Sequence, residues 1–375
     1  MKIIRSLRDL NSFLKPNKAL ILFGARQVGK TTLLNDFLKT TSFKYRLETG
    51  DNLATQHLFN SRSLETLTEY ASGYDLIAID EAQKISGIGE GLKLLLDHMP
   101  GIRIIATGSS SFDLAGQVGE PLTGRKTALA LYPVSQLELA SMFPVFDVKQ
   151  RLEEWLVFGG YPEVVTTSNR SDKIGILEEI AQSYLFKDIL ELDKVRNSKT
   201  LVALCRLLAF QIGSEVSLSE LGRQLGIDQK TVARYCDILE KAFIIRSLQG
   251  FSRNLRSEIT KKSKYYFLDN GIRNAVIANF NTIELRDDIG KLWENFLFIE
   301  RLKKRSYQSI YANSYFWRTW EQQEIDYIEE RDGKLYGFEF KWKQKRMKTP
   351  ALWRKTYPVA SFEIIDRSNY ISFVT

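Results

Sequence analysis

The residues best suited to chemistry stand close together near the start of the sequence, in LILFGARQVGKTTLL at positions 20–34. Every fixed position of the phosphate-binding pattern G-x-x-x-x-G-K-[ST] is filled, by Gly24, Gly29, Lys30 and Thr31. In this pattern the lysine reaches the β- and γ-phosphates, the next hydroxyl binds Mg²⁺, and the glycines let backbone N–H groups point at the phosphates. The sequence therefore predicts a site for ATP and Mg²⁺ formed by Gly24, Ala25, Arg26, Gln27, Val28, Gly29, Lys30, Thr31 and Thr32.

A strand and a helix must hold this loop in place. The apolar run at 19–23 predicts a buried parallel strand, and residues 31–38 continue as a helix. The helix N-terminus adds partial positive charge where the phosphates would bind.

A pair of carboxylates follows the next predicted strand. Residues 76–79 are apolar, and Asp80 and Glu81 come directly after them. Ligands of doubly wound sheets bind at the carboxyl ends of the strands, so Asp80 is placed to hold Mg²⁺ through water and Glu81 to polarise the attacking water. The alternative is that Glu81 only caps the following helix.

Two further polar positions extend the predicted site. The strand at 103–106 ends in Thr107 and Ser109, which are candidates to contact the γ-phosphate or the attacking water; alternatively, residues 109–111 simply begin a helix. Arg125 precedes another strand at 127–131, at an edge of the sheet where a neighbouring subunit's nucleotide could meet it. The alternative for Arg125 is a surface pair with Glu120.

The segments GARQVGKTT, IDEAQK, ATGSS and LTGR, in this order, resemble a prokaryotic AAA-type ATPase subfamily, and the resemblance runs over nearly the whole chain. It implies a homo-oligomer in which Arg125 acts as a trans arginine finger. It also implies a helical lid entered through the turn GGYP at 159–162. Relatives usually carry an aspartate after the second strand, whereas this chain has Leu47-Glu48-Thr49, which leaves the role of an acidic residue there open.

Composition sets broad limits on the class of protein. The 375 residues are 44% hydrophobic and 26% charged, with 53 Lys and Arg against 45 Asp and Glu, giving a net charge of +8. The two cysteines, Cys205 and Cys236, lie in apolar helical patterns and suggest reduced core residues of a cytoplasmic protein. No signal peptide or membrane span is expected, and His57 and His98 leave little scope for a zinc site or a histidine-based triad.

The middle of the chain predicts a winged helix-turn-helix. Residues 219–226 and 228–241 read as two helices joined by a short glycine-containing turn, followed by strands and a basic segment at 251–264. Gln229 and Tyr235 are placed to face a DNA groove beside basic side chains, although such modules also serve as packing or protein-contact units. The predicted DNA-binding residues are Lys230, Arg234, Arg253, Arg256, Lys261, Lys262 and Lys264.

A second chemical signal lies near the end of the chain. Glu294 is on a predicted helix at 290–305, and a hairpin turning at Asp332-Gly333 carries Asp326 on one strand, with Glu339 and Lys341 on the other. Opposed carboxylates repel unless a cation lies between them. The set resembles the PD-(D/E)XK nuclease superfamily, although Ile325 replaces the motif's proline; the resemblance implies Mg²⁺ ligation by Glu294, Asp326 and Glu339, with Lys341 catalytic. The alternative is a solvated ladder of alternating charges.

Together these patterns predict an α/β protein with a P-loop doubly wound parallel sheet of AAA type, a helical lid, a winged helix and a C-terminal α/β PD-(D/E)XK nuclease-like domain. The expected boundaries are 1–135, 136–200, 201–275 and 276–375. The expected function is a Mg²⁺-dependent ATPase that acts on DNA, with nuclease activity undecided. The alternative is a nucleotide-switched signalling or scaffold ATPase whose C-terminal domains are catalytically inactive and bind protein partners.

Overall fold

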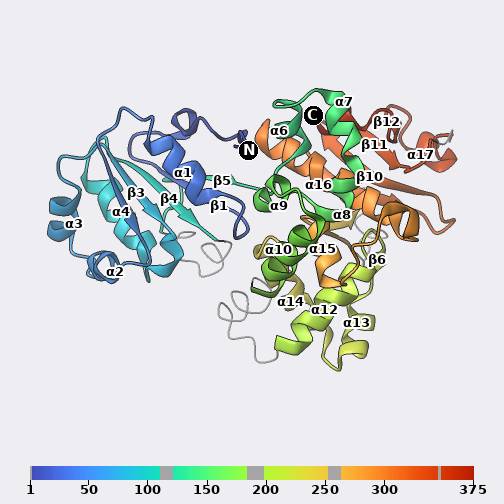
Figure 1. Cartoon of the computed structure of the whole chain (residues 1–375), viewed down its shortest axis with the longest axis horizontal. Helices are drawn as coiled ribbons and strands as arrows, with labels where there is room; N and C mark the ends of the chain where they lie inside the picture. Colours follow the sequence, from blue (N-terminus) through green and yellow to red (C-terminus); the bar gives the residue numbers. More distant parts are fainter. Residues whose placement is uncertain (1, 110–120, 184–197, 252–262, 345–347) are drawn as a thin grey trace. The chain divides into compact units, whose positions relative to one another are not determined.

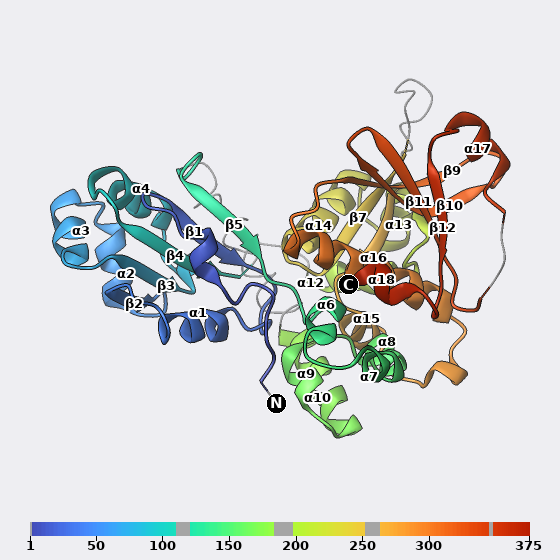
Figure 2. The same ribbon diagram turned by 90° about the horizontal axis from the view of Figure 1, so that it is seen from above.

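The chain forms two compact units in the computed structural model, which describes residues 2–109, 121–183, 198–251, 263–344 and 348–375. The N-terminal unit contains Met1–Tyr132 together with Lys241–Phe243, and the C-terminal unit contains Pro133–Phe186, Arg196–Glu240 and Ile244–Thr375. Figures 1 and 2 show the elements of each unit from two sides.

The N-terminal unit is a parallel sheet with helices on both faces. Its strand order is β2-β3-β4-β1-β5, and every neighbouring pair is parallel, so all carboxyl ends meet at one edge. This order fits the predicted doubly wound P-loop sheet. The elements are η1 (Leu10–Phe13), β1 (Ala19–Phe23), α1 (Lys30–Leu38), β2 (Tyr45–Thr49), α2 (Leu53–Asn60), α3 (Leu64–Ala71), β3 (Leu76–Asp80), η2 (Ala82–Lys84), α4 (Ile88–His98), β4 (Arg103–Gly108) and β5 (Lys126–Ala130).

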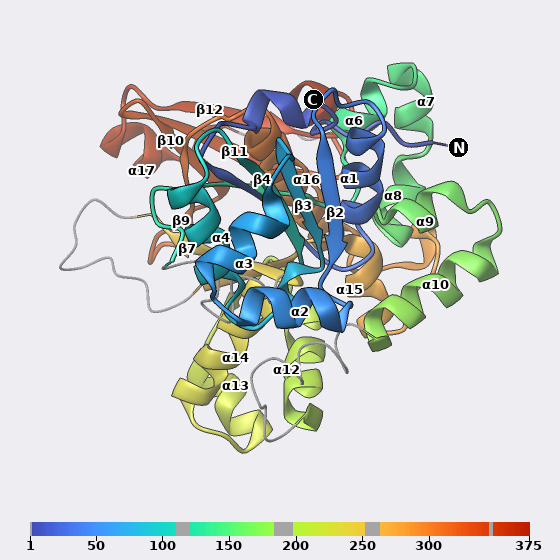
Figure 3. The same ribbon diagram turned by 90° about the vertical axis from the view of Figure 1, so that its left-hand side faces the viewer.

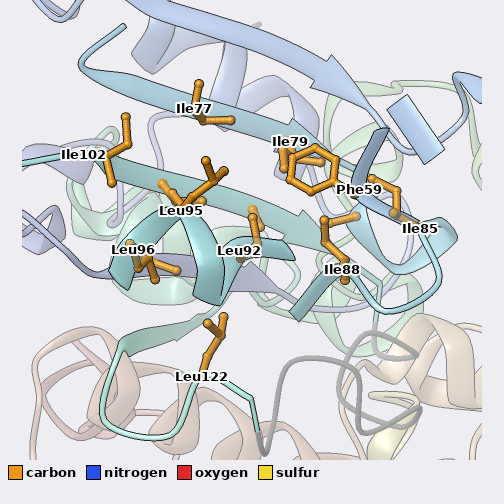
Figure 4. Packing of buried hydrophobic residues seen from close by; sticks show 14 of the residues in the cluster. Phe59, Ile77, Ile79, Ile85, Ile88, Leu92, Leu95, Leu96, Ile102 and Leu122 are labelled. Carbon is orange, nitrogen blue, oxygen red and sulfur yellow. The ribbon is translucent and has the colours of Figure 1, made fainter. Parts of the chain in front are cut away.

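The core of this unit fills the space between the sheet and α4. Strand residues such as Ile77 and Ile79 meet Leu92 and Leu95 of α4, and Phe59 of α2 closes one side (Figure 4). These side chains are fully buried, as expected for strands that are covered on both faces. Figure 3 shows α1 beside the sheet, with α2, α3 and α4 as a separate group. The packed core fixes the strand ends that carry the polar residues.

The C-terminal unit combines helices with one mixed sheet of seven strands, in the order β12-β11-β10-β9-β7-β8-β6. The long helix α16 packs against β8, β11 and α18. The elements are α6 (Gln136–Ala140), α7 (Val145–Gln150), α8 (Leu152–Phe158), α9 (Pro162–Thr166), α10 (Arg170–Ser183), α12 (Ser198–Phe210), β6 (Glu215–Val216), α13 (Leu218–Leu225), α14 (Gln229–Lys241), β7 (Ile245–Gly250), β8 (Ser263–Phe267), α15 (Asn270–Val276), η4 (Ile283–Leu285), α16 (Ile289–Tyr307), β9 (Asn313–Arg318), β10 (Glu324–Arg331), β11 (Lys334–Phe340), α17 (Ala351–Thr356), β12 (Ser361–Ile365) and α18 (Tyr370–Val374).

The sheet crosses the expected boundary between residues 275 and 276. Strand β7 pairs in parallel with β9, placing Gln249 opposite Tyr315 and Gly250 opposite Phe316. Most of the segments expected to form the helical lid, the winged helix and the last domain fall in one compact unit, whereas Lys241–Phe243 belong to the N-terminal unit. Within the described residues, every helix is too short or too polar to cross a bilayer.

The GGYP turn has a structural task inside this unit. Gly159 has φ 69°, and a Cβ there would lie 2.0 Å from a carboxylate oxygen of Asp269. The N–H of Gly160 donates to Asp269 Oδ2 at 2.7 Å, while Asp269 also caps α15. Gly159 is thus needed for the close approach of α8 to the start of α15, whereas Gly160 is required by Val134, whose carbonyl oxygen would lie 2.4 Å from a Cβ there.

Candidate functional site

The phosphate-binding loop between β1 and α1 has the backbone that its glycines permit. Gly29 adopts the left-handed region at φ 94°, immediately before Lys30 begins the helix. A Cβ on Gly24 would lie 2.1 Å from the carbonyl oxygen of Leu131, so only glycine fits. Ala25 and Val28 are buried and anchor the loop, whereas Arg26 and Gln27 are exposed.

Lys30 fills the centre of this loop. Its Nζ donates to the carbonyl oxygens of Gly24 at 3.0 Å and Ala25 at 2.8 Å. Burial lowers the pKa of Lys30 to about 8, and the negative charges of Glu81 and Asp80 only partly offset this. The ammonium is thus held where phosphate oxygens could accept its hydrogen bonds.

Asp80 connects three of the predicted site residues at the end of β3. Its Oδ2 accepts a hydrogen bond from Thr31 Oγ1 at 2.8 Å, and its Oδ1 accepts one from Thr107 Oγ1. A threonine hydroxyl and a carboxylate are oxygen ligands of the kind that Mg²⁺ prefers. The pair Thr31–Asp80 therefore fits a Mg²⁺ ion. Thr32, the next hydroxyl, is exposed on the same first turn of α1.

Glu81 is held in an unusual backbone conformation beside this pair. It lies in the left-handed region at φ 52°, and its N–H donates to Thr107 Oγ1 at 3.2 Å. Its Oε2 accepts a hydrogen bond from Gln83 Nε2 at 2.6 Å, and Gln83 Oε1 in turn accepts from the N–H of Ser109 at 3.3 Å. Since η2 begins after Glu81 without a side-chain cap, the structure does not give Glu81 the capping role.

Sequence reasoning missed several contributors to this site. Gln83 lies within the quoted IDEAQK segment, but its link from Glu81 to β4 depends on the fold. Arg5 is buried and its Nη1 donates to the carbonyl oxygen of Val28 at 2.6 Å, bracing the loop. Gly50 lies so close to Glu81 that a Cβ would be 2.2 Å from its carbonyl oxygen.

Arg125 lies far from the nucleotide loop of its own chain. Its carbonyl oxygen accepts from the N–H of Ala19, the first residue of β1, whereas the loop follows Phe23, the last. The length of β1 from Ala19 to Phe23 therefore separates the backbone of Arg125 from the start of the loop by about 13 Å, at about 3.3 Å per residue. Its side chain pairs with Asp97 at 2.6 Å, and Glu120, the alternative partner, lies outside the described residues.

The acidic residue after the second strand also has local partners. Glu48 accepts hydrogen bonds from Arg46 at 3.2 Å and from Thr55 at 2.8 Å. Both of its carboxylate oxygens are therefore engaged within β2 and α2. This arrangement gives Glu48 a structural role in the N-terminal unit.

Two helices, α13 and α14, lie where the sequence predicts a helix-turn-helix. Ser217 caps α13, Gly226 ends it at φ 68°, and Asp228 accepts a hydrogen bond from the N–H of Thr231 in the first turn of α14. Lys230 and Arg234 are exposed on α14, as the DNA-binding prediction requires.

Two predicted members of the DNA-binding face are corrected by the structure. Tyr235 is 3% exposed and belongs to the core, because it lies on the inner side of α14. Lys264 is 6% exposed, because its ammonium pairs with Glu294 instead of pointing to solvent. Arg253, Arg256, Lys261 and Lys262 lie outside the described residues.

The C-terminal hairpin has the predicted register. Arg331 pairs with Lys334 around a two-residue turn, and Tyr327 pairs with Phe338, which places Asp326 opposite Glu339. A bulge between Ile325 and Ile328 shifts the pairing of β10 with β9 at this position. Bulges of this kind re-aim single side chains and occur often beside active sites.

Glu294, Asp326 and Glu339 form an acidic cluster whose carboxylates accept hydrogen bonds from other groups of the protein. Glu294 Oε1 accepts hydrogen bonds from Lys264 Nζ at 3.0 Å and Tyr266 Oη at 2.7 Å. Asp326 Oδ2 accepts from the N–H of Phe340 at 2.8 Å, and Glu339 Oε1 accepts from Lys341 Nζ at 2.6 Å.

The carboxylates of the cluster influence one another. Burial, followed by repulsion from Glu294, raises the pKa of Asp326 to about 7, and burial followed by repulsion from Asp326 does the same for Glu339. The alternative, a solvated ladder of alternating charges, is therefore wrong, because Asp326 and Glu339 are buried.

Family models match three segments of the chain. Residues 16–140 match the model of an AAA domain, residues 149–283 match a domain of unknown function (DUF8612), and residues 289–360 match another (DUF4143). Uncharacterized proteins of Mycobacterium bovis and Mycobacterium tuberculosis are each 29% identical over 89% of this chain and 72% of their own length. An uncharacterized protein of Methanocaldococcus jannaschii is 25% identical over 86% of this chain and 74% of its own length.

Among solved structures, a RuvB variant from Thermotoga maritima is 18% identical over 64% of this chain and 84% of its own, with a TM-score of 0.28. Because this score is low, the fold is assigned from the strand order of the sheet and from the phosphate-binding loop of the chain itself. The AAA-domain match and the site at the strand ends together support an AAA-type P-loop ATPase.

Proposed function

We propose that this chain is a Mg²⁺-dependent ATP hydrolase that acts on DNA through its C-terminal unit. The observation that supports hydrolysis is the convergence of Lys30, Thr31, Asp80 and Glu81 at the carboxyl ends of parallel strands. Binding alone would need the loop and Lys30, whereas a carboxylate next to the Mg²⁺-binding pair also supplies a base for water.

Each residue has a role set by its position. The backbone of residues 24–29, Lys30 and Thr32 bind the phosphates, while Thr31 and Asp80 hold Mg²⁺, which when bound offsets phosphate charge. Glu81 takes the proton from the attacking water, and Thr107 holds Asp80 and the Glu81 backbone in place. Ser109 is positioned through Gln83 at the end of β4.

We also propose that turnover requires a second copy of the chain. Arg125 lies at the opposite ends of the strands from its own loop, so it is able to stabilise γ-phosphate charge only on a neighbouring subunit. Such an arrangement makes the active species a homo-oligomer with Arg125 acting in trans.

The DNA proposal rests on the exposed basic side chains of α14. Lys230 and Arg234 stand one helical turn apart, and the three helices α12, α13 and α14 with strands β6, β7 and β8 follow the element order of a winged helix. The net charge of +8 favours an anionic partner. The free, buried thiols of Cys205 and Cys236 favour a reducing compartment, and we propose the cytoplasm.

The nuclease-like part of the proposal concerns fold only. The likeness to PD-(D/E)XK enzymes is supported by a helix glutamate, Glu294, two opposed hairpin acids, Asp326 and Glu339, and a lysine, Lys341. The contacts inside this cluster do not favour cleavage, so we assign the C-terminal unit a binding role.

The test is the ATPase rate of the whole chain with and without single-stranded, double-stranded and nicked DNA. We expect Lys30→Ala to abolish nucleotide binding, and Glu81→Gln to keep binding but stop turnover. Stimulation of the wild-type rate by DNA supports the proposal. Turnover that is indifferent to every DNA, together with strong capture of a protein partner, would establish the scaffold alternative instead.

A further inference from the structure

The ammonium of Lys264 lies where a metal ion would be expected in the acidic cluster. Its Nζ is 3.0 Å from Glu294 Oε1 and 3.9 Å from Asp326 Oδ1, and its side chain is 7% exposed. Lys264 comes from β8, Glu294 from α16 and Asp326 from β10, so three separate elements meet at this cation.

The remaining oxygens of the cluster do not form an open metal site. Tyr266 Oη donates to the same Glu294 oxygen that Lys264 contacts, and the N–H of Phe340 occupies one oxygen of Asp326. Among the buried side-chain atoms of Glu294, Asp326, Glu339 and Lys341, all of which the structure describes, Glu339 Oε2 alone has no hydrogen-bond partner. Donors of the protein thus already engage oxygens of Glu294 and Asp326 that Mg²⁺ would need as ligands.

Geometry across the described part of the chain agrees with this conclusion. No group of three or more His, Cys, Asp or Glu side chains there is arranged to hold a metal ion. A divalent ion bound to Glu294 and Asp326 would also have to share their oxygens with the positively charged Lys264, and like charges repel strongly at such distances. The cluster therefore has its own cation already.

We propose that Lys264 is the built-in counter-ion of this cluster and takes the place of the divalent metal that the nuclease-like fold implies. The positive charge of Lys264 lies between Glu294 and Asp326, reduces their mutual repulsion and links β8 to α16 and β10. The cluster is then a charge network that holds the C-terminal unit together, and it does not cleave nucleic acid with a metal. This inference is independent of ATP turnover in the N-terminal unit.

The experiment is a Mn²⁺ titration of the nucleotide-free full-length chain, followed by electron paramagnetic resonance. Every sample carries Asp80→Asn, so that the phosphate-binding loop contributes no metal site. We expect no stoichiometric Mn²⁺ binding when Lys264 is intact. Lys264→Met, which keeps the length of the side chain but removes its charge, should create one Mn²⁺ site, and adding Asp326→Asn should weaken that site by about tenfold or more.

Lys343→Met is the matched control. Lys343 is exposed just after β11, the strand that carries Glu339, so its replacement should create no Mn²⁺ site. Stoichiometric Mn²⁺ binding with Lys264 intact that Asp326→Asn removes would overturn the proposal. A folded Lys264→Met chain that binds no Mn²⁺ would overturn it as well. Should that variant fail to fold, the titration with Lys264 intact decides the matter alone: binding refutes the proposal, and its absence supports it.

Discussion

Thr31 and Asp80 are joined by a hydrogen bond of 2.8 Å from Thr31 Oγ1 to Asp80 Oδ2. The bond links the first turn of α1 to the end of β3, through two residues whose positions differ by 49 in the sequence. Because the other oxygen of Asp80 accepts from Thr107, the carboxylate is oriented from two sides. The two side chains that we propose as Mg²⁺ ligands are therefore held together by the protein itself.

Removing the hydroxyl of Thr31 should weaken Mg²⁺ use more than ATP binding. Thr31→Val keeps the shape of the side chain but leaves Asp80 Oδ2 without this donor. We expect turnover to fall by about tenfold or more, equivalent to about 1–3 kcal/mol, and the Mg²⁺ concentration for half-maximal rate to rise. Thr31→Ser is the control and should retain most activity. An unchanged Mg²⁺ dependence in Thr31→Val would remove Thr31 from the metal site.

Gln83 should act as a positioning residue for Glu81. Its amide donates to the Glu81 carboxylate at 2.6 Å while its oxygen accepts from Ser109, so it fixes where that carboxylate points. Gln83→Leu should lower kcat by about tenfold, the cost of about one hydrogen bond to a charged group, with little change in ATP affinity. Gln83→Glu should be worse, because two carboxylates would then face each other. A normal or raised kcat in Gln83→Leu would show instead that Gln83 restrains Glu81.

Nucleotide binding should depend on pH through Lys30. In the free protein, burial lowers the pKa of Lys30 to about 8, and bound phosphates should raise it again because they favour the charged form. Affinity should therefore be full below pH of about 8 and fall by up to about tenfold per unit as the pH rises above it.

The measurement is binding of a fluorescent ATP analogue in the presence of a chelator, so that metal binding does not contribute. Lys30→Arg is the control, since a guanidinium stays charged over the whole range and should give a flat profile with weaker binding. A flat profile in the wild-type chain would contradict a titrating Lys30.

The N-terminal unit was largely predictable from the sequence because its signals are local. A strand, a glycine loop and a helix follow each other within residues 19–38, and Asp80 directly follows a run of apolar residues. Parallel pairing then brings these strand ends to one edge. Arg5 and Gln83 were not predicted, because each is an ordinary polar residue in the sequence. Their contacts with Val28 and Glu81 become visible only in the folded structure.

The C-terminal unit shows the limit of such patterns. The alternation of side chains along the two hairpin strands correctly predicted that Asp326 faces Glu339. This prediction was possible because a two-residue turn fixes the register of its strands locally. The burial of Lys264 is not local: it depends on β8 packing beside α16, 30 residues further along the chain. The basic segment around Lys264 therefore predicted, wrongly, that its side chain is exposed and contacts DNA phosphates. The pairing of β7 with β9 across the expected domain boundary had no signal in the sequence.

Arg125 should matter for turnover but not for ATP affinity. A trans arginine finger typically contributes about 10³-fold or more, so Arg125→Ala should lower kcat by that order. Asp97→Asn is the matched control, because it removes the exposed ion pair of Arg125 without removing the arginine, and exposed pairs contribute only about 0–1 kcal/mol. Light scattering should find an oligomer with ATP. A fully active monomer would make Arg125 an ordinary surface residue.

The exposed basic face of α14 should set the salt dependence of DNA binding. Each phosphate contact releases counterions, so affinity falls with salt by a log–log slope of about −0.9 per contact on duplex DNA. Replacing Lys230 and Arg234 together by alanine should make the slope shallower by about 1.8 if each side chain contacts one phosphate. Lys15→Ala with Lys39→Ala is the control, since it removes the same charge from exposed positions of the N-terminal unit. An unchanged slope and affinity in the α14 variant would show that this helix does not contact DNA, whereas a loss of DNA-stimulated ATP turnover in the same variant would tie the helix to the ATPase.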